Sequence, residues 1–329
     1  MRVLITGAGG FIGRALTEAL TRRGWLAGPG GEMRPITELI LADLAAPPDP
    51  GARPPMQVRR IAGDLTDPEV FARALAPFPD AVFHLAATLT LEAEADPVRG
   101  WEINVELPRR LLEAAREMGR LAGNRPRLVC VSSIAAFGGA LPERVSDAQA
   151  QTPTTSYGTA KSIVELLIND YARKGHVDGR ALRLPIVLTR PGAPVPAVSD
   201  IIAGLAREPL RGRDAASPLA EDDRFPVVSV GRAAANLVRL HDLPAEVFGV
   251  SRAVNQPGLT VSVADIRAAL ARAAGPEAAA RLTCAPDPAV RAVVAGWPRE
   301  FVSDLPLDPP LEADPDFDAV IADFRARGG

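Results

Sequence analysis

The apolar positions at the start of the chain predict a strand, a tight turn and a helix. Residues 2–6, "RVLIT", are followed by glycines, which is typical of a short strand buried on both faces of a parallel sheet. From Ile12 to Leu20 apolar residues recur at helical spacing, and Gly24 ends that pattern. The chain therefore opens with a strand, a glycine turn and a helix.

Strand-like and helical segments continue to alternate through the first half of the chain. Further apolar runs predict strands at 38–43, 58–65, 81–87 and 127–133. Helical stretches lie between them, including 68–76 and 105–118. This alternation predicts an α/β fold with a doubly wound parallel sheet of the Rossmann type.

Pro and Gly residues mark the segments that we expect to lie outside this sheet. Two Pro/Gly clusters, at 26–35 and 46–55, flank the second strand and predict surface loops. Prolines recur through residues 191–226 and favour an irregular covering segment. A helix at 231–243 and a strand at 253–256 follow, and the remaining tail mixes helices with Pro-rich turns.

Composition and charge exclude several classes of protein. The net charge is −3 and the arginines are scattered among carboxylates, so the chain lacks the basic patch that a nucleic-acid partner requires. Its two cysteines, Cys130 and Cys284, lie far apart, which predicts neither a disulfide framework nor a metal site and favours a cytoplasmic protein. The start shows no signal-peptide pattern, and no apolar run reaches the roughly 18 residues that span a membrane, so we expect no membrane partner.

The turn after the first strand has the spacing of a dinucleotide-binding loop. In "TGAGGFIG", Gly7, Gly10 and Gly13 are three residues apart, between a strand and a helix. One glycine turns the chain, one lets the backbone approach a pyrophosphate, and one lets helix and strand pack closely. The helix N-terminus then faces the anion. We expect a nucleotide here, and the alternative is a purely structural turn.

Two aspartates at strand ends indicate which dinucleotide is bound. Asp43 ends the second strand, where its carboxylate would accept hydrogen bonds from the adenine ribose and repel a 2′-phosphate. No arginine directly follows Asp43, and both observations favour NAD over NADP. Asp64 closes the third strand and is expected near the adenine. The alternatives are a solvated strand-end residue at Asp43 and a turn-capping residue at Asp64.

A Tyr and a Lys four residues apart stand out, because the chain has two tyrosines and only two lysines among its 37 basic residues. Tyr157 and Lys161 begin an apolar-periodic segment and share one helix face. Ser133 lies 24 residues before Tyr157, at the end of a strand. It is therefore expected at the sheet edge where ligands of open α/β folds bind.

Together these three side chains predict the oxidation of a hydroxyl group. Ser133 would hold the substrate hydroxyl by a hydrogen bond, and Tyr157 would take its proton. The ammonium of Lys161, helped by the positive nicotinamide ring, would make the phenol acidic enough for this near neutral pH. Hydride would leave the same carbon for the cofactor. Arg would serve poorly in place of Lys161, because its planar head is bulkier. The alternative is a helix-surface pair with no chemical role.

Taken in order, these motifs resemble the extended short-chain dehydrogenase/reductase family, which contains NAD-dependent sugar-nucleotide epimerases and dehydratases. The resemblance rests on "TGAGGFIG", "GDL", "HLAA", "NVELPRRLLEAA", "SSIAAFGG" and "YGTAK", and it covers residues 1 to about 190. It implies catalytic roles for Ser133, Tyr157 and Lys161. It also implies that NAD contacts Gly7, Gly10, Phe11, Ile12, Gly13, Asp43, Asp64, Leu65, Leu85, Ala86, Ala87, Asn104, Tyr157, Lys161, Pro185, Ile186 and Val187.

The same resemblance implies how the chain is divided. Asn104 matches a family asparagine that braces the active-site helix, and the strand end "LPIV" would set the backbone of Ile186 and Val187 against the nicotinamide amide. His84, inside the fourth strand, is interpreted as structural. We expect an NAD-binding Rossmann domain made of 1–184 plus about 227–256. A smaller substrate-binding cap would be made of 185–226 and 257–329.

The second half resembles a branch of this family that oxidises the C2 hydroxyl of four-carbon sugar acids, such as D-erythronate, with NAD. Such a substrate is small and anionic, and Arg190 is a candidate donor for its carboxylate. Ser133, Thr88 and Thr90 lie where the family contacts substrate. A surface ion pair at Arg190 and a β-branched strand extension at the threonines are the alternatives. The segment "RPGAPVPAVSD" is less polar and less basic than the loop of that branch, which bears on the identity of the acid.

Two other functions stay open. One is a nucleotide-sugar epimerase or dehydratase, although Ile134 and Ala135 follow Ser133 where a dehydratase places an acid and a base. The other is a non-catalytic dinucleotide-binding regulator, which would not need to keep Tyr157 and Lys161. The resemblance also implies a homodimer, with a four-helix interface formed by the segment from Asn104 and the one that carries Tyr157.

Overall fold

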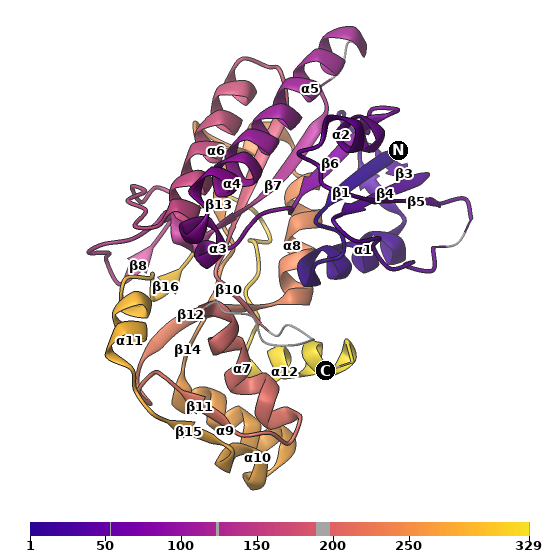
Figure 1. Cartoon of the computed structure of the whole chain (residues 1–329). Coiled ribbons are helices and arrows are strands. Elements are labelled where there is room, and N and C mark those ends of the chain that lie inside the picture. The colour runs from indigo at the N-terminus through magenta and orange to yellow at the C-terminus, as the bar shows by residue number, and fades with distance from the viewer. Residues whose placement is uncertain (53, 123–124, 189–197, 329) are drawn as a thin grey trace.

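The computed structural model describes residues 1–52, 54–122, 125–188 and 198–328, and its centre is a seven-stranded sheet (Figure 1). All strand pairs in this sheet are parallel. From one edge to the other its strands are β13 (Ala253–Asn255), β9 (Asp178–Leu184), β7 (Arg127–Ser133), β6 (Ala81–His84), β1 (Arg2–Thr6), β4 (Glu38–Asp43) and β5 (Gln57–Ala62). The strand order reverses between β1 and β6, which is the switch point of a doubly wound fold. The predicted α/β fold of the Rossmann type is confirmed.

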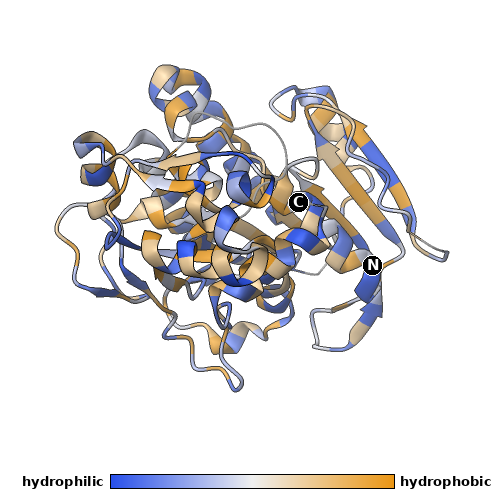
Figure 2. Cartoon of the chain, turned by 90° about the horizontal axis from the view of Figure 1, so that it is seen from below, coloured by the Kyte–Doolittle hydropathy of each residue, from blue (hydrophilic) through white to orange (hydrophobic). Residues whose placement is uncertain are grey.

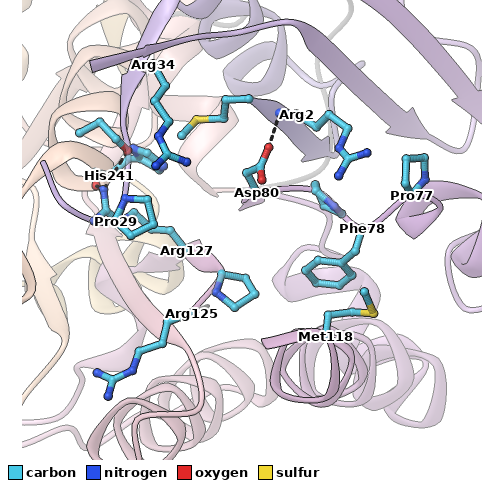
Figure 3. Close-up of a pocket in the computed structure, with 14 residues that line it drawn as sticks. Arg2, Pro29, Arg34, Pro77, Phe78, Asp80, Met118, Arg125, Arg127 and His241 are labelled. Carbon is cyan, nitrogen blue, oxygen red and sulfur yellow. Dashed lines mark hydrogen bonds between the residues drawn. The ribbon is translucent and has the colours of Figure 1, made fainter. Parts of the chain in front are cut away.

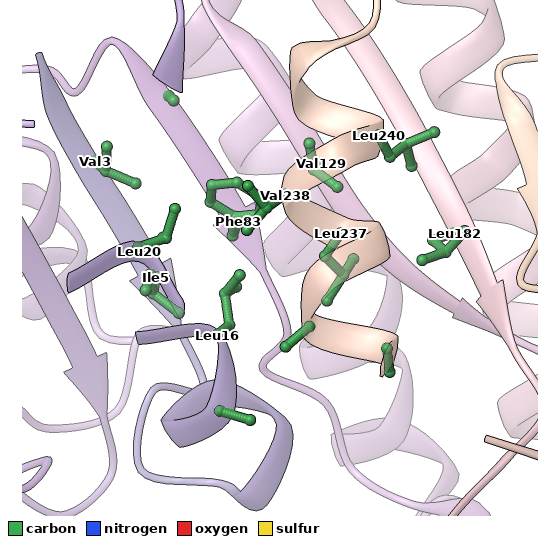
Figure 4. Close-up of a cluster of buried hydrophobic side chains, with 14 of the residues drawn as sticks. Val3, Ile5, Leu16, Leu20, Phe83, Val129, Leu182, Leu237, Val238 and Leu240 are labelled. Atoms are coloured by element: carbon green, nitrogen blue, oxygen red, sulfur yellow. The ribbon is translucent and has the colours of Figure 1, made fainter. Parts of the chain in front are cut away.

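Helices cover both faces of this sheet. One face packs against α1 (Phe11–Arg23) and α8 (Val230–Asp242), where Val3, Ile5 and Phe83 meet leucines of both helices (Figure 4). The other face packs against α2 (Pro68–Leu75), α5 (Leu107–Ala122) and α6 (Ser156–Arg173). Blue and orange stretches alternate along the helices in the hydropathy view (Figure 2), as expected of helices that turn one side to a sheet and the other to solvent.

A separate hydrophobic cluster belongs to the elements in the lower half of the view in Figure 1. It surrounds a three-stranded sheet of β10 (Ile186–Leu188), β12 (Arg224–Ser229) and β14 (Leu259–Ser262). The helices of this part are α7 (Val198–Leu210), α9 (Val263–Ala274), α10 (Pro276–Ala280), α11 (Pro288–Ala295) and α12 (Phe317–Ala326). The placement of the domain boundaries stays a prediction.

Short elements connect these layers. Two-stranded pairs are formed by β2 (Trp25–Ala27) with β3 (Met33–Pro35), β11 (Ala215–Ser217) with β15 (Leu282–Cys284), and β8 (Arg144–Val145) with β16 (Glu300–Phe301). The short helices are α3 (Thr90–Ala95), α4 (Pro97–Trp101), η1 (Glu102–Glu106), η2 (Ile134–Ala136) and η3 (Ala245–Val247). In the part of the chain that the structure describes, no helix is both long and apolar enough to cross a bilayer.

Two expectations for the segments rich in Pro and Gly were wrong. Residues 26–35 are not a plain surface loop, because β2 and β3 form a hairpin and Leu26 is fully buried. Residues 191–226 are not irregular throughout, because they include the helix α7. That helix forms because Ile202 and Leu205, together with neighbouring alanines, give it a buried apolar face. Pro209 stands in its last turn and has no N–H to donate, and the helix ends one residue later.

A cluster of buried charged side chains lies on the side of the sheet where its strands begin, next to a cavity of about 220 Å³ (Figure 3). Arg180 is fully buried and donates hydrogen bonds to the carbonyls of His241 (3.0 Å) and Leu243 (2.6 Å), at the C-terminal end of α8. Asp178 accepts from Arg127 (2.9 Å) and Arg180 (2.6 Å). The carboxylate of Asp178 therefore balances the guanidinium groups that cap α8.

We predict that Asp178→Asn lowers the free energy of unfolding by about 3 kcal/mol at neutral pH, because it leaves buried guanidinium charge unpaired. Burial opposes ionisation of Asp178, but Arg180 and Arg127 outweigh it and hold the pKa of the carboxyl below its ordinary value. Its ionised form therefore stabilises the fold above about pH 4, and this contribution is lost as the pH falls toward the lower folded-state pKa. Urea unfolding of both proteins across this pH range should show the difference shrinking in acid. A difference that stays constant would contradict this assignment.

Candidate functional site

The glycine loop leaves no room for side chains between β1 and α1. A Cβ atom on Gly7, whose φ is +70°, would lie 2.8 Å from the backbone nitrogen of Ala86. On Gly13 it would lie 2.1 Å from the carbonyl oxygen of Gly7. Gly10 is the N-cap of α1 and supplies no side chain to cap it. The first backbone N–H groups of α1 are therefore available to an anion such as a pyrophosphate.

Asp43 holds the loop from the end of β4. Its Oδ2 accepts a hydrogen bond from the backbone N–H of Gly9 (2.8 Å), and its Oδ1 accepts one from that of Leu44 (2.7 Å). The backbone N–H of Ala8 donates to the carbonyl of Ala42 (3.2 Å). These contacts fix a carboxylate beside the glycine loop, in the place where a dinucleotide presents its adenine ribose.

A cleft of about 480 Å³ runs along this edge of the sheet at the switch point between β1 and β6. The predicted cofactor and substrate residues on its wall are Gly7, Gly10, Asp43, Asp64, Leu65, Leu85, Ala86, Ala87 and Thr88. Phe11, Ile12 and Gly13 lie behind the loop rather than on this wall, and the first two pack against the core. Arg14, Glu92 and Arg99 also line the cleft, and the sequence analysis did not identify them.

Asp64 is held by groups from two segments. Its carboxylate accepts hydrogen bonds from the N–H (2.8 Å) and hydroxyl (2.7 Å) of Thr66 and forms an ion pair with Arg99 of α4. Burial raises the pKa of the Asp64 carboxyl, but these donors lower it further than burial raises it. Asp64 is therefore ionised and its position is set by Arg99. No spacing in the sequence marks Arg99, because it reaches Asp64 only through the fold.

Ser133 and Tyr157 are brought together by a close approach of two backbone segments. The Ser133 Oγ, at the end of β7, accepts a hydrogen bond from the N–H of Ala135 (3.1 Å). A Cβ on Gly158, in the first turn of α6, would lie only 2.0 Å from the carbonyl oxygen of Ala135. Gly158 therefore lets the helix turn that carries Tyr157 rest on the turn that follows Ser133. This role was not predicted from the sequence, although Gly directly follows the Tyr.

Lys161 lies beneath the tyrosine. Its side chain is 6% exposed, and its Nζ donates to the carbonyl of Val131 (2.9 Å) and lies 5.3 Å from the centre of the Tyr157 ring. His84 is also buried here, with its Nδ1 2.7 Å from the Thr6 hydroxyl. Burial, and then the charge of Lys161, lower the pKa of His84 to about 3. His84 is therefore neutral, and Lys161 is the charged group next to the phenol.

Asn104 forms hydrogen bonds with Thr88, and it lines a surface pocket together with residues of the first turn of α6. Its Oδ1 accepts from the N–H of Thr88 (2.9 Å), and its Nδ2 donates to the Thr88 hydroxyl (2.9 Å). The expected brace of α6 is not among these hydrogen bonds. The alternative of a strand extension at the threonines was wrong, because β6 ends at His84 and Thr90 begins α3.

The remaining predicted contacts lie around the end of β9. Pro185 separates β9 from β10, so that Ile186 pairs with Val227 of the small sheet. Ile186 is buried, whereas Val187 is partly exposed. Arg190 and the segment 191–197 fall outside the described residues.

The comparisons with known proteins agree with this geometry. The profile of the NAD dependent epimerase/dehydratase family matches residues 3–257. The chain is 40% identical over 329 residues to the D-erythronate dehydrogenase of Cupriavidus necator, covering 100% of this chain and 99% of the relative. It is 35% identical over 326 residues to the D-erythronate dehydrogenase of Haemophilus influenzae, covering 98% of each. A crystal structure of a nucleoside-diphosphate-sugar epimerase from Agrobacterium tumefaciens superposes with a TM-score of 0.89 at 35% identity, covering 98% of this chain and 92% of that one.

The observed site fits the cofactor that the family name states. The backbone at Gly7 and Gly13 has no room for a Cβ, the N-terminus of α1 carries no capping side chain, and Asp43 stands beside the loop. These are the features that bind the pyrophosphate and ribose of NAD. The chain belongs to the NAD dependent epimerase/dehydratase family.

Proposed function

We propose that the protein oxidises the C2 hydroxyl of a small sugar acid, such as D-erythronate, with NAD as the acceptor. The observation that carries this proposal is the full-length similarity, at 40% and 35% identity, to two D-erythronate dehydrogenases. Two observations support it: the helix turn that carries Tyr157 packs on the turn that follows Ser133, and the Nζ of Lys161 lies 5.3 Å from the centre of the Tyr157 ring. A general base and a hydroxyl-binding group are what such an oxidation requires.

Each of the three side chains has a defined role in this mechanism. The Ser133 Oγ already accepts from Ala135, so its own hydrogen is free to bind the oxygen of the substrate. Tyr157, in its phenolate form, takes the hydroxyl proton and becomes a phenol as the C2–H bond breaks. Lys161 stabilises the phenolate, since the ammonium is fixed below the ring by the Val131 carbonyl. NAD, when bound, supplies the acceptor for the hydride.

The cofactor would lie along the cleft at the switch point. Gly7, Gly10 and the N-terminus of α1 would hold the pyrophosphate, with Phe11, Ile12 and Gly13 shaping the loop. Asp43 would accept from the adenine ribose, and Asp64, held by Arg99, would face the adenine amine. The backbone of Leu85 to Ala87 would line the middle of the cofactor, and Pro185 to Val187 would meet the nicotinamide amide.

A nucleotide-sugar epimerase is the second candidate, and the similarity to the Agrobacterium epimerase structure favours it. An epimerase or dehydratase of this family needs further polar groups around the sugar. After Ser133, however, the chain continues with Ile134 and Phe137, which are buried in an apolar cluster with Phe301. The hydroxy-acid dehydrogenase is therefore the better supported of the two, and the retained Tyr157 and Lys161 argue against a regulator that only binds the cofactor.

We further propose a cytoplasmic homodimer formed through α5 and α6. Leu121 on α5 and Leu166 on α6 are each 64% exposed. A second copy packed against these two helices would cover both side chains.

For Tyr157→Phe we expect kcat with D-erythronate to fall at least about 100-fold, because the general base is lost, while the Kd for NAD stays within about twofold. NADH formation, followed by absorbance with four- to six-carbon sugar acids, measures the activity. Wild-type protein that binds NAD but oxidises none of these acids would overturn the proposed function. Epimerisation of UDP- or dTDP-sugars should then be assayed as the second candidate.

Asp43→Asn should shift cofactor preference toward NADP. The amide keeps the shape of the side chain, but it no longer repels a 2′-phosphate, so the ratio of kcat/KM for NADP to that for NAD should rise about tenfold or more. Asp80→Asn removes a carboxylate at the opposite edge of the sheet and serves as the matched control. An unchanged ratio in Asp43→Asn would show that Asp43 does not select the cofactor.

A further inference from the structure

A buried group of polar side chains lies directly behind the three proposed catalytic residues. We call it the Glu165 cluster. It consists of the side chains of Ser132, Glu165, Arg183 and Asn255, the partly buried side chain of Gln151, and the backbone carbonyl of Asp147. The side chains of Glu165 and Arg183 are only 3% and 4% exposed. Glu165 is on α6, and Ser132 precedes Ser133 on β7. The cluster therefore joins the two elements that carry the catalytic groups.

The carboxylate of Glu165 is bound from three directions. Arg183 of β9 donates to its Oε2 through Nε (3.0 Å) and a terminal nitrogen (2.8 Å). The hydroxyl of Ser132 and the amide of Gln151 donate to it as well. A buried charge with this number of donors holds its position firmly, and removing one partner leaves the other charge without compensation.

The position of Glu165 along α6 gives these bonds a consequence for the site. Tyr157, Lys161 and Glu165 follow one another at intervals of four residues and so share a helix face. On this face Lys161 bonds to the carbonyl of Val131, and Glu165 bonds to Ser132, the next residue of β7. Two successive residues of the strand are thus tied to two successive turns of the helix. This double attachment sets where Tyr157 stands relative to Ser133.

The cluster also reaches the apolar wall beside the site. Arg183 lies over the ring of Phe137, with its central carbon 5.1 Å from the ring centre, and donates to Asn255 (3.1 Å). The amide of Asn255 donates to the carbonyl of Val302 (3.0 Å), next to Phe301. Phe137 and Phe301 pack in the cluster that follows Ser133. The same buried charges thus support both the helix with the base and the wall next to it.

We propose that Glu165 and Arg183 are positioning residues for the oxidation, which set the alignment of Tyr157 and Lys161 against Ser133. The inference rests on the proposed function, because it assigns those three residues to catalysis. A displacement of about 1 Å at a reacting group can lower a rate about 100-fold. NAD binding should change little, because the glycine loop, Asp43 and Asp64, which would hold the pyrophosphate and the adenine half of the cofactor, lie on other elements, and only the nicotinamide end would lie near α6 and the end of β9.

The test compares Glu165→Gln with Asp178→Asn. Each change neutralises a buried carboxylate that pairs with arginine. The two carboxylates bind arginines at opposite ends of β9, and only Glu165 is a residue of α6. We expect both variants to lose stability in urea. Only Glu165→Gln should lower kcat, by about 10-fold to 100-fold, with the KM for NAD within about twofold. Arg183→Lys keeps the charge but loses the planar fork, and it should lower kcat by a smaller factor.

A second readout needs no substrate. The chain has only two tyrosines, and burial together with the acceptor Glu113 raises the pKa of Tyr171 to about 12. Tyrosinate absorbance that appears at a pH below that at which Tyr171 ionises therefore reports Tyr157 alone. The same titration of Tyr157→Phe gives the background absorbance. If Glu165 aligns Lys161 with the phenol, this absorbance should appear at higher pH in Glu165→Gln than in wild type or Asp178→Asn.

The two readouts separate the possible failures. Loss of kcat with a displaced tyrosinate curve supports the positioning role. A kcat no lower than that of Asp178→Asn, or an unmoved tyrosinate curve, overturns it. If wild-type protein oxidises no sugar acid, the proposed function fails, and the tyrosinate titration still decides the alignment. Should Glu165→Gln fail to fold, Ser132→Ala removes one donor and leaves the charges paired, and it should displace the curve in the same direction.

Discussion

Both faces of the seven-stranded sheet are apolar, and the rest of the structure depends on covering them. Val3 and Ile5 of β1 belong to the cluster under α1 and α8, whereas Leu4 belongs to the one on the other face. Because the strands are parallel, each connection crosses a face and returns to the same edge. The polar residues at strand ends therefore gather where the strands end, with Asp43 bonded to the glycine loop and Ser133 at the end of β7.

Buried charge is used twice along β9, with different consequences. At its amino end Asp178 balances the arginines that cap the last turn of α8. Near its carboxyl end Arg183 pairs with Glu165 and attaches α6 to the strand that ends in Ser133. The chemistry of the two pairs is the same, so their effect on function is decided by the helix that each one holds.

The structure also explains why Lys rather than Arg stands at position 161 in a chain with few lysines. The buried basic residues of both clusters are arginines, whose planar fork binds several acceptors at once. Lys161 instead makes one bond, to the carbonyl of Val131, and keeps its compact ammonium beneath the ring of Tyr157. A point charge suits this place, because the phenol and not a carboxylate is the group to be stabilised.

Local sequence determined the sheet, the glycine loop and the spacing of Tyr157 and Lys161, because apolar periodicity, backbone space for glycine and helix pitch act between residues close in the chain. It failed for the hairpin at 26–35 and for α7, where prolines and glycines masked residues that become buried. Only the tertiary structure decided the roles of Gly158 and Arg99 and the partners of Glu165. Their contacts join segments distant in sequence, such as Glu165 to Ser132 and Arg99 to Asp64, and the packing of helices on the sheet alone brings them together.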